Sequence, residues 1–417
     1  MAKKILLFAP AAFNLAETSR MIEIAKGVRN HSRARDVFDI WFISEGGRFE
    51  TLIHDNGFPL KTVEPRITEE KIAHLAAVND EEKLASVYTK QEMIQKVNAD
   101  ISCLKEIKPT AVITGSYLSM PVSCRVLNIP IVWTVQSTWF KEFFAAGAGL
   151  TDRLKPKIVK KAADFLIFTS IRFWMWYGFI HAVNQAARHF GLKAYKPVFS
   201  YFEGEITLVA EPPEFSNAKL PANYHFIGPL ITKENFSIPD IVTNIPHDKP
   251  LVFFAMGSSG LPRIVVEIIE SFEGKPYRVI APVKFLIENL QNIRIPSNVV
   301  VTDWLPALEI NKICDIAVIH GGIGTVMTAA YAGKPIVGIG MQPEQVANLA
   351  CLVRKGFAIR VSKSKHVGVK VQKAIESLLS DENAKRNAKV FAEKVGNWDG
   401  PKMAADLLYN EYGMDIT

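Results

Sequence analysis

The chain has 417 residues, of which 48% are hydrophobic, which is enough for two domains with sizeable cores and excludes a disordered or fibrous protein. Its formal net charge of +7 suits an anionic ligand, but the basic residues are scattered and form no stripe with interleaved aromatics, which argues against nucleic acid. Four cysteines without C-x-x-C or Cys/His spacing indicate buried free thiols in a reducing compartment and give no indication of a metal site.

The N-terminal part alternates short apolar runs with helix-length segments. The apolar stretch in its first ten residues is too short for a secretory signal and lacks a small-residue cleavage site, so we predict a strand there. Residues 11–14 should form a loop, followed by a helix whose apolar face carries Met21, Ile22 and Ile24. Further apolar runs, at 40–43, 111–113 and 129–133, predict more strands of a parallel sheet.

The segment 165–180 is unusually rich in aromatic residues and follows a group of lysines at 155, 157, 160 and 161. Arg172 interrupts it, and its length falls short of the roughly 20 apolar residues that a membrane-spanning helix needs. Three interpretations stay open, because periodicity cannot separate them: a hydrophobic acceptor pocket, a helix on a membrane surface flanked by positive charge, or ordinary core.

Proline-marked polar residues at 232–248 predict a linker between two domains. Beyond the linker, the apolar run 251–256 predicts a strand that ends in the turn 257–260, with the sequence Gly-Ser-Ser-Gly. Helical spacing resumes at Ile264, Val265 and Ile268. A glycine and hydroxyl turn between a strand and a helix favours an anion site, although an ordinary turn with Ser258 as helix cap fits the same pattern.

The most informative stretch is 320–348. An apolar run at 316–319 predicts a buried parallel strand, and three glycines, at 321, 322 and 324, begin where that strand stops. Glycine lets the main chain approach a ligand, and the free N–H groups of a helix N-terminus favour bound phosphate. Thr325, which opens the following helical pattern, adds a hydroxyl, and His320 adds a ring N–H.

A second strand is predicted one βαβ step later, at 336–339, and its carboxyl end delivers Glu344 and Gln345. Open parallel sheets bind ligands at that edge. Glycines in a strand-to-helix turn are often purely conformational. Phosphate-directed donors followed by an acid–amide pair and a downstream asparagine, Asn348, are a much rarer combination, so the sequence predicts a site for a phosphorylated ligand.

This stretch resembles the donor-sugar signature of GT-B glycosyltransferases, in the family that includes the plant secondary-product, macrolide, antibiotic and UDP-glucuronosyl transferases. Residues 299–306, which contain Trp304 and Pro306, are similar to that family's strand and Trp-x-Pro loop. The resemblance implies an α/β GT-B fold of two Rossmann-like domains with parallel sheets. It implies an acceptor domain at 1–231, a linker at 232–248, a nucleotide-sugar domain at 249–395, and a C-terminal helix at 396–417 that crosses back to the acceptor domain.

The resemblance also assigns donor-binding roles by position, with the nucleotide sugar as a co-substrate and no further cofactor. The alternative for Trp304 is an ordinary core aromatic. The implied donor site comprises Gly257, Ser258 and Ser259 facing the diphosphate, Trp304 stacked on the base, His320 at the α-phosphate, Gly322, Gly324 and Thr325 around the β-phosphate, and Glu344 and Gln345 at the sugar hydroxyls.

Three positions depart from the family pattern. Ala307 follows the Trp-x-Pro element where the family usually has Gln, and Glu344 replaces the usual Asp. Thr328 stands where relatives with uridine donors carry a Glu that accepts from both ribose hydroxyls. Because a threonine cannot hold a vicinal diol as a carboxylate does, we expect a dTDP-sugar, which has no 2′-hydroxyl, and keep a UDP-sugar as the alternative.

The family's catalytic histidine is missing, together with the aspartate that orients it. Glu17 occupies the histidine position, and the place of the aspartate falls at 114–116, which ends in Ser116. A carboxylate has no tautomer to fix, so Glu17 is the candidate general base, provided that burial raises its pKa. Two alternatives are that Glu17 is simply a first-turn helix acid, or that Glu142, in a predicted loop after a strand, is the base.

The resemblance thus implies an inverting, metal-independent hexosyltransferase that moves a sugar from dTDP or UDP to a hydroxyl of a hydrophobic small molecule. Two other classes stay open. One is a membrane-associated lipid glycosyltransferase, which liposome co-sedimentation would reveal. The other is a non-catalytic nucleotide-binding auxiliary protein, favoured if donor binds but no transfer or hydrolysis occurs. We expect a cytoplasmic protein, with peripheral contact at the inner membrane surface as an alternative.

Overall fold

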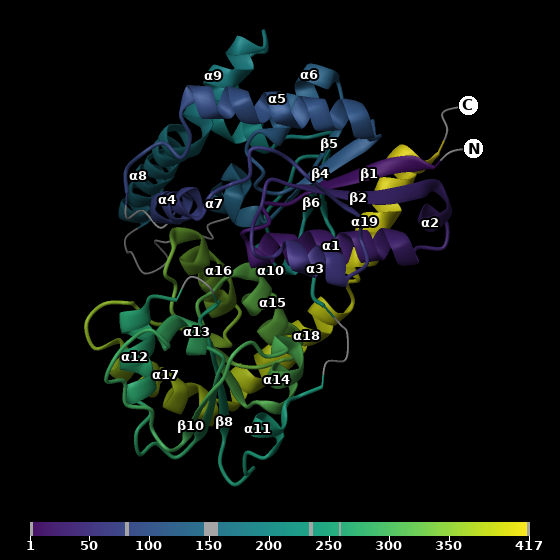
Figure 1. Ribbon diagram of the computed structural model, residues 1–417. Coiled ribbons are helices and arrows are strands. Elements are labelled where there is room, and N and C mark those ends of the chain that lie inside the picture. Colours follow the sequence, from purple (N-terminus) through teal and green to yellow (C-terminus); the bar gives the residue numbers. More distant parts are fainter. Residues whose placement is uncertain (1–2, 80–82, 146–156, 233–236, 258–259, 415–417) are drawn as a thin grey trace.

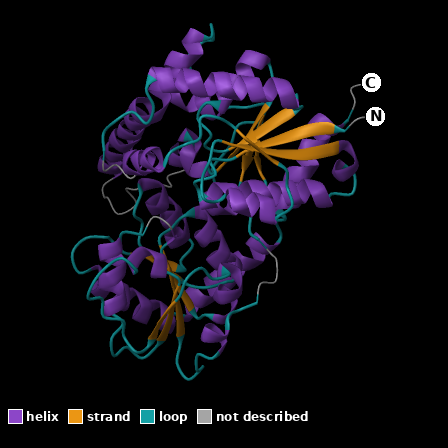
Figure 2. Cartoon of the chain, viewed as in Figure 1, coloured by secondary structure: helices purple, strands orange, loops and turns teal. Residues whose placement is uncertain are grey.

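The computed structural model describes residues 3–79, 83–145, 157–232, 237–257 and 260–414. The chain forms two stacked halves, each built on one β-sheet (Figure 1). Figure 2 shows helices on both faces of each sheet. Strand pairing is parallel in both sheets, so each half has the layered architecture of a Rossmann-like domain, as the sequence predicts.

The first sheet has the strand order β3-β2-β1-β4-β5-β6-β7. Its central strands are buried along their whole length, which explains why they read as continuous apolar runs in the sequence. The strands are β1 (Lys4–Ala9), β2 (Phe38–Ser44), β3 (Leu60–Thr62), β4 (Ala111–Thr114), β5 (Ile131–Val135), β6 (Ile206–Val209) and β7 (Tyr224–Phe226).

Two long helices of the first half, α1 and α5, begin at a side-chain cap. Asn14 accepts hydrogen bonds from the Ala16 and Glu17 amides at the start of α1, and Thr89 with Glu92 forms a capping box at the start of α5. The helical segments are α1 (Leu15–Asn30), α2 (Ala34–Val37), α3 (Glu50–Asp55), α4 (Glu69–Asn79), α5 (Lys90–Ile107), α6 (Met120–Leu127), η1 (Ser137–Trp139), α7 (Lys141–Ala145), α8 (Lys157–Met175), η2 (Trp176–Ile180), α9 (His181–His189), η3 (Val198–Phe202) and α10 (Pro213–Ser216).

The second sheet has the order β10-β9-β8-β11-β12-β13, which repeats the order of the first six strands of the first sheet. Its strands are β8 (Leu251–Ala255), β9 (Arg278–Ala281), β10 (Val299–Val301), β11 (Ile316–Ile319), β12 (Ile336–Gly338) and β13 (Ala358–Arg360). The helices are α12 (Pro262–Glu270), α13 (Lys284–Ile287), α14 (Ala307–Ile313), α15 (Ile323–Tyr331), α16 (Pro343–Arg354), α17 (Val367–Ser380) and α18 (Glu382–Gly396).

Each sheet carries a hydrophobic core on both faces, because successive side chains of a strand point to opposite sides. In β1, Leu7 packs with residues of α5 and α9, whereas Leu6 and Phe8 pack with residues of α1. Residues of β8 divide in the same way between two clusters of the second half. All four cysteines are buried and free, as predicted.

Three local predictions need correction. The apolar run at 129–133 starts a strand only at Ile131, because Pro130 has no N–H to give to the sheet, although its carbonyl accepts from the Val112 amide at 2.9 Å. The predicted linker contains a short helix, α11 (Asp240–Thr243), which buries Val242. Leu261 is the residue that precedes α12, so the helix cap that the sequence suggested for Ser258 is wrong.

The C-terminal helix returns to the first half, where α19 (Gly400–Leu408) lies against α1 (Figure 1). Ala404, Ala405 and Leu408 join the core cluster of α1. Backbones approach closely along this path. A Cβ on Gly27 of α1 would lie 2.2 Å from the Pro401 carbonyl oxygen, and one on Gly228 would lie 2.4 Å from Trp398 Cβ. Glycine at these positions is what lets the last helix join the two halves.

Replacing Gly27 by alanine should loosen this junction. The new methyl group would meet backbone atoms, which cannot turn aside as a flexible side chain can, so we expect a loss of about 1–3 kcal/mol. Urea denaturation followed by circular dichroism measures the change as a fall in the unfolding midpoint.

Gly396→Ala is the matched control, since a Cβ there would meet no described atom within 4 Å and the residue ends α18. It should leave the midpoint unchanged or raise it slightly. Equal midpoints for the two variants would contradict the role given to Gly27.

Candidate active site at the facing edges of the two sheets

The carboxyl edges of the two sheets face each other across the boundary between the halves. Trp139 lies in η1, directly after β5, and Glu344 lies in the first turn of α16, after β12. Trp139 Nε1 donates a hydrogen bond to Glu344 Oε2 at 3.3 Å, so the two edges are in contact. Figure 1 shows α10 and α16 at this boundary. Open parallel sheets bind ligands at such an edge, which makes it the candidate site.

The N-terminus of α15 has the features of an anion site. Gly322 precedes the helix, and no side chain of the described residues caps its first N–H groups. A Cβ on Gly324 would meet no described atom within 4 Å, so this turn opens on free space. The Thr325 hydroxyl lies at the same helix end, where it donates to the Gly322 carbonyl at 2.9 Å, so it would have to turn away from that carbonyl to donate to a bound anion. Uncapped amides and the helix dipole favour negative charge here.

His320 lies between the two glycine turns that the sequence singled out. A Cβ on Gly257 would lie 2.6 Å from His320 Cε1, and one on Gly322 would lie 2.5 Å from His320 Nε2, so both positions need glycine. Burial lowers the pKa of His320 to about 4, against an opposing hydrogen bond to the Ala255 backbone. His320 is therefore a neutral imidazole at pH 7. Its Nδ1 has no hydrogen-bond partner among the described residues. Ser258 and Ser259 lie outside the described residues.

Glu344 and Gln345 share one helical turn but face different surroundings. Gln345 is buried, and its Oε1 accepts from the Met341 amide at 2.9 Å. Glu344 instead faces the first half, where Trp139 and the Gln136 side chain hydrogen-bond to it. Burial raises the pKa of Glu344, and Gln136, Arg20 and Trp139 oppose that shift. Of the two residues, Glu344 is the one that reaches the boundary between the halves.

Two further donor-site candidates occupy the second half. Trp304 is 64% exposed in the loop between β10 and α14, so the interpretation as a core aromatic is wrong. Thr328 is buried in α15, and its hydroxyl donates to the Gly324 carbonyl at 2.7 Å. Asn348 links the turns after β11 and β12, because its Nδ2 donates to the Gly321 carbonyl at 3.1 Å.

Glu17 turns inward from the first turn of α1 and is 1% exposed. Its Oε1 accepts from the Ser116 amide at 2.7 Å and from the Ala11 amide at 3.3 Å, and its Oε2 contacts the Ser116 hydroxyl. A side chain at Gly115 would lie 3.1 Å from Oε1, so the missing Cβ makes room for the carboxylate. The structure thus brings together Glu17 and the segment that the sequence aligned with the missing aspartate.

Burial raises the pKa of Glu17 from an ordinary 4.5 to about 7. Arg20, one helical turn later, lowers this pKa, as do hydrogen bonds from the Ser116, Ala11 and Gly115 backbone. Desolvation outweighs these effects because the carboxylate lies below the surface. Arg20 also interacts with Glu344 across the boundary, and burial lowers the pKa of its guanidinium. A carboxyl group that titrates near pH 7 has the property that a general base requires.

Glu142 does not lie in a loop, as the sequence suggested. It belongs to the short helix α7, which follows η1, and its Oε1 lies 3.8 Å from Lys141 Nζ. The loop prediction failed because only one residue separates η1 from α7.

Sequence reasoning missed three polar residues that the structure brings to the site, namely Gln136, Trp139 and Glu211. Glu211 is fully buried after β6, and burial raises its pKa to about 7 against hydrogen bonds from Ser137 and Ser216. Gln136 and Trp139 follow β5. Their position in the sequence could have revealed them, because each comes just after a strand. The carboxyl ends of parallel strands share one edge of the sheet, which is the argument that identified Glu344 and Gln345 in the second half.

The aromatic segment 165–180 divides between α8 and η2. Phe165, Leu166 and Phe173 are exposed, so the interpretation as ordinary core is wrong for these residues. Trp174 packs inward, and its Nε1 donates to the Val78 carbonyl at 3.2 Å. In the part of the chain that the structure describes, no helix has the length and apolar character that crossing a bilayer requires. Within the same residues, no group of His, Cys, Asp and Glu side chains could hold a metal ion.

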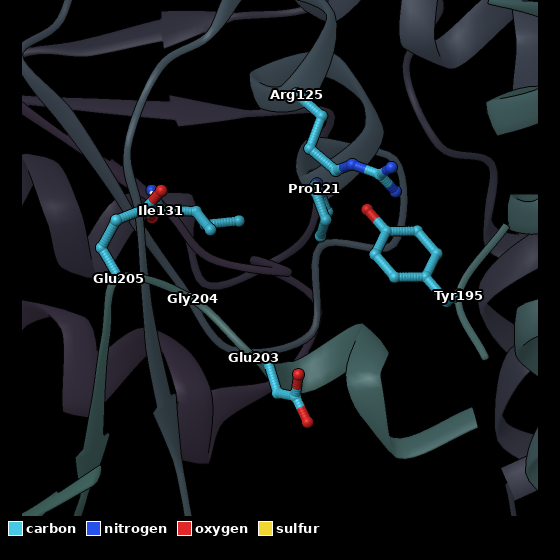
Figure 3. Close-up of a pocket in the computed structure, with 7 residues that line it drawn as sticks. All are labelled: Pro121, Arg125, Ile131, Tyr195, Glu203, Gly204 and Glu205. Atoms are coloured by element: carbon cyan, nitrogen blue, oxygen red, sulfur yellow. Dashed lines mark hydrogen bonds between the residues drawn. The ribbon is translucent and has the colours of Figure 1, made fainter. Parts of the chain in front are cut away.

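A cavity of about 400 Å³ lies elsewhere on the first half (Figure 3). Ile131, the first residue of β5, and Glu205, which precedes β6, help to line it, together with Arg125 and Tyr195. These positions mark the amino ends of the strands, whereas Glu17, Trp139 and Glu344 gather at the carboxyl ends. The cavity is therefore separate from the candidate site.

Comparisons with known proteins agree with this geometry. A family model described as erythromycin biosynthesis protein CIII-like, C-terminal domain, matches residues 283–407. A PGL/p-HBAD biosynthesis glycosyltransferase of Mycobacterium tuberculosis is 24% identical over 394 residues, which cover 94% of this chain and 88% of the relative. The solved structure of spinosyn forosaminyltransferase SpnP has a TM-score of 0.69 at 16% identity, covering 99% of this chain and 100% of that one. The chain has the GT-B fold, and the relatives that it resembles along nearly its whole length are glycosyltransferases.

A second solved structure with this fold, glycosyltransferase VinC in complex with dTDP, has a TM-score of 0.66 at 16% identity, covering 98% of this chain and 99% of that one. The protein is a glycosyltransferase. The expected GT-B fold, with a last helix that packs on the first half, is confirmed.

Proposed function

We propose that this glycosyltransferase moves a sugar, with inversion at the anomeric carbon and without a metal ion, from a nucleoside diphosphate to a hydroxyl of a hydrophobic acceptor. The second half would hold the donor and the first half the acceptor. The observation that carries the proposal is the Glu17 carboxylate, which is buried at the facing edge of the first sheet with a pKa of about 7. Such a group can take the proton of an acceptor hydroxyl near neutral pH.

The N-terminus of α15 supports the part of the proposal that concerns the leaving group. Its first amides lack a side-chain cap among the described residues, and the Gly324 turn opens on free space. His320 adds a neutral ring beside the same turn. Negative charge that develops on the departing diphosphate would be stabilised by the helix dipole and these N–H donors, which act from fixed positions.

The placement of the candidate base and the candidate leaving-group site on different halves supports inversion. Glu17 belongs to α1 and the diphosphate site to α15, so a sugar held between them would be attacked on the face opposite its leaving group. The acceptor oxygen would form the new bond as the bond to the diphosphate breaks, and its proton would pass to Glu17. Glu17 is 1% exposed, so the acceptor would reach it only after the site opens, and the Trp139–Glu344 contact between the halves is one that such an opening would break.

Thr328 supports a donor without a ribose 2′-hydroxyl. Its hydroxyl is already committed to the Gly324 carbonyl, and it offers no carboxylate to a vicinal diol. Structural relatives include VinC in complex with dTDP and spinosyn rhamnosyltransferase SpnG complexed with thymidine diphosphate. We therefore favour a dTDP-sugar over a UDP-sugar as the donor.

A second candidate acceptor is a lipid presented at a membrane surface. Phe165, Leu166 and Phe173 of α8 and Trp176 of η2 are exposed, and the rings of Phe173 and Trp176 are in contact. Amphipathic helices with exposed apolar side chains of this kind lie in the interfacial plane of a bilayer. This observation favours peripheral membrane contact, in which the enzyme would take its acceptor from the lipid phase.

Glu17→Gln should abolish the base while keeping the shape of the side chain. Transfer should fall by roughly 100-fold or more, the usual contribution of a general base. In the unsubstituted enzyme kcat should rise as the pH increases through about 7, because the base acts deprotonated, and this rise should be missing in the variant. Product formation measured from pH 5.5 to 9 tests both statements, and a rate within a few fold of the unsubstituted enzyme would reject Glu17 as the base.

Protein stability provides the control for this variant. Since the pKa of Glu17 is raised from 4.5 to about 7 on folding, burial of its charge should reduce the stability of the enzyme as the pH rises through that window. Glu17→Gln lacks this charge, so its melting temperature should equal or exceed that of the unsubstituted enzyme at pH 8. If the melting temperature of Glu17→Gln is lower instead, its loss of activity is due to misfolding and not to loss of the base.

Thr328→Glu should shift the donor preference towards uridine. A carboxylate at this position can accept hydrogen bonds from both ribose hydroxyls, so the ratio of UDP affinity to dTDP affinity should increase by about tenfold. Thr328→Val, which has nearly the same size, should leave the ratio unchanged. Calorimetric titration measures both, and tighter binding of UDP than dTDP by the unsubstituted enzyme would contradict the donor proposed here.

Trp176→Ser combined with Phe173→Ser should reduce co-sedimentation with vesicles that contain phosphatidylglycerol. The substitutions remove two exposed aromatic rings. Trp41→Ser is the matched control, because Trp41 is 37% and Trp176 39% exposed, but Trp41 belongs to β2. If the unsubstituted enzyme, the double variant and Trp41→Ser pellet with the vesicles to the same extent, these two rings do not bind a lipid surface.

A further inference from the structure

The segment 136–139 belongs to the first half, and two of its side chains contact Glu344 of the second half. Trp139 Nε1 donates to Glu344 Oε2 at 3.3 Å, and the Gln136 side chain also hydrogen-bonds to this carboxylate. Both donors follow β5, three residues apart on one tight turn. The residue aligned with sugar recognition in the second half is therefore faced by neutral N–H donors that come from the first half.

The buried carboxylate of Glu211 holds this turn in place. Ser137 lies between the two donors, and its amide and hydroxyl both donate to Glu211, at 3.2 Å and 2.6 Å. Glu211 is 0% exposed and also accepts from Ser216. Because the buried Glu211 carboxylate holds both the amide and the hydroxyl of Ser137, these two hydrogen bonds fix the backbone of the turn.

The indole of Trp139 is oriented by packing as well. Its ring meets Phe202 edge to face, with ring centroids 5.0 Å apart and an interplanar angle of 87°. This contact fixes the ring plane and aims Nε1 at Glu344. The Trp139 N–H is thus held in place by Phe202 on one side and by the Ser137–Glu211 anchor on the other.

The pair formed by Trp139 and Glu344 is chemically complementary to a hydroxyl group. An indole N–H can only donate, and a carboxylate can only accept, whereas a hydroxyl accepts from the first and donates to the second. Their direct bond, at 3.3 Å, is long for a hydrogen bond to a carboxylate, whose usual N–H to oxygen distance is about 2.7–2.9 Å. A sugar hydroxyl inserted between them would satisfy both groups.

We propose that the 136–139 turn is a wall of the donor-sugar subsite, contributed by the first half, which binds a ring hydroxyl of the sugar between Trp139 and Glu344. Ser137 and Glu211 are positioning residues that hold this wall in place. The inference rests on the proposed function, in which the donor occupies this cleft with its sugar towards Glu344. It adds that recognition of the sugar, unlike that of the diphosphate, requires both halves.

Trp139→Phe tests the proposal on the full chain, because phenylalanine keeps the contact to Phe202 and removes the N–H. Affinities for dTDP-glucose and for dTDP are measured by calorimetry. Loss of one hydrogen bond to a charged partner should weaken dTDP-glucose by about fivefold to tenfold. Affinity for dTDP, which has no sugar, should stay within twofold. Ser137→Ala should change the same ratio in the same direction by less, and the double variant should be no worse than Trp139→Phe alone.

Trp174→Phe is the matched control, since it removes an indole N–H that donates to the Val78 carbonyl at 3.2 Å, away from Glu344. Both affinities should be unchanged in it. If Trp139→Phe weakens dTDP as much as dTDP-glucose, or leaves both unchanged, the sugar subsite proposed here is overturned while the proposed function stands. If the unsubstituted enzyme binds neither dTDP nor UDP, the proposed function fails and this inference fails with it.

Discussion

Parallel pairing is the constraint on which the rest of this structure depends. Because every strand of a parallel sheet runs the same way, all its carboxyl ends lie along one edge, and the loops that leave that edge converge. Here two such edges face each other, joined by the Trp139–Glu344 contact and by α19, which returns from the second half to pack on α1. Residues as distant in sequence as Glu17, Glu211 and Glu344 thereby come to one boundary.

The chemistry of the site follows from burying carboxylates at this boundary with few hydrogen-bond donors. Glu17 accepts hydrogen bonds from the backbone and from the Ser116 hydroxyl, but these do not offset its desolvation, so its pKa rises to about 7. The same burial that makes the group basic near neutral pH costs folding stability when it ionises. Burial has the opposite effect on the pKa of His320, which it lowers, so the ring stays neutral. A neutral ring can form a hydrogen bond to phosphate but cannot offset its negative charge.

The sequence was sufficient for features that depend on neighbouring residues. Several strands, among them β1, β4, β8 and β11, and the glycine turn after β11 could be predicted from local pattern, and family resemblance pointed to Glu17 and to the segment 114–116. The contacts of Gln136, Trp139 and Glu211 could not, because they join segments that meet only after both halves have folded. The aromatic segment was ambiguous for a similar reason, since periodicity does not tell which face of α8 is covered.

The account as a whole rests on an anion site at the N-terminus of α15, beside His320. Calorimetric titration of the unsubstituted protein with dTDP and with thymidine tests it most directly, because the two ligands differ only in the diphosphate. The account predicts that dTDP binds at least about 100-fold more tightly than thymidine, as expected for several charge-assisted hydrogen bonds. Equal affinity for the two, or no measurable binding of any nucleoside diphosphate, would contradict it.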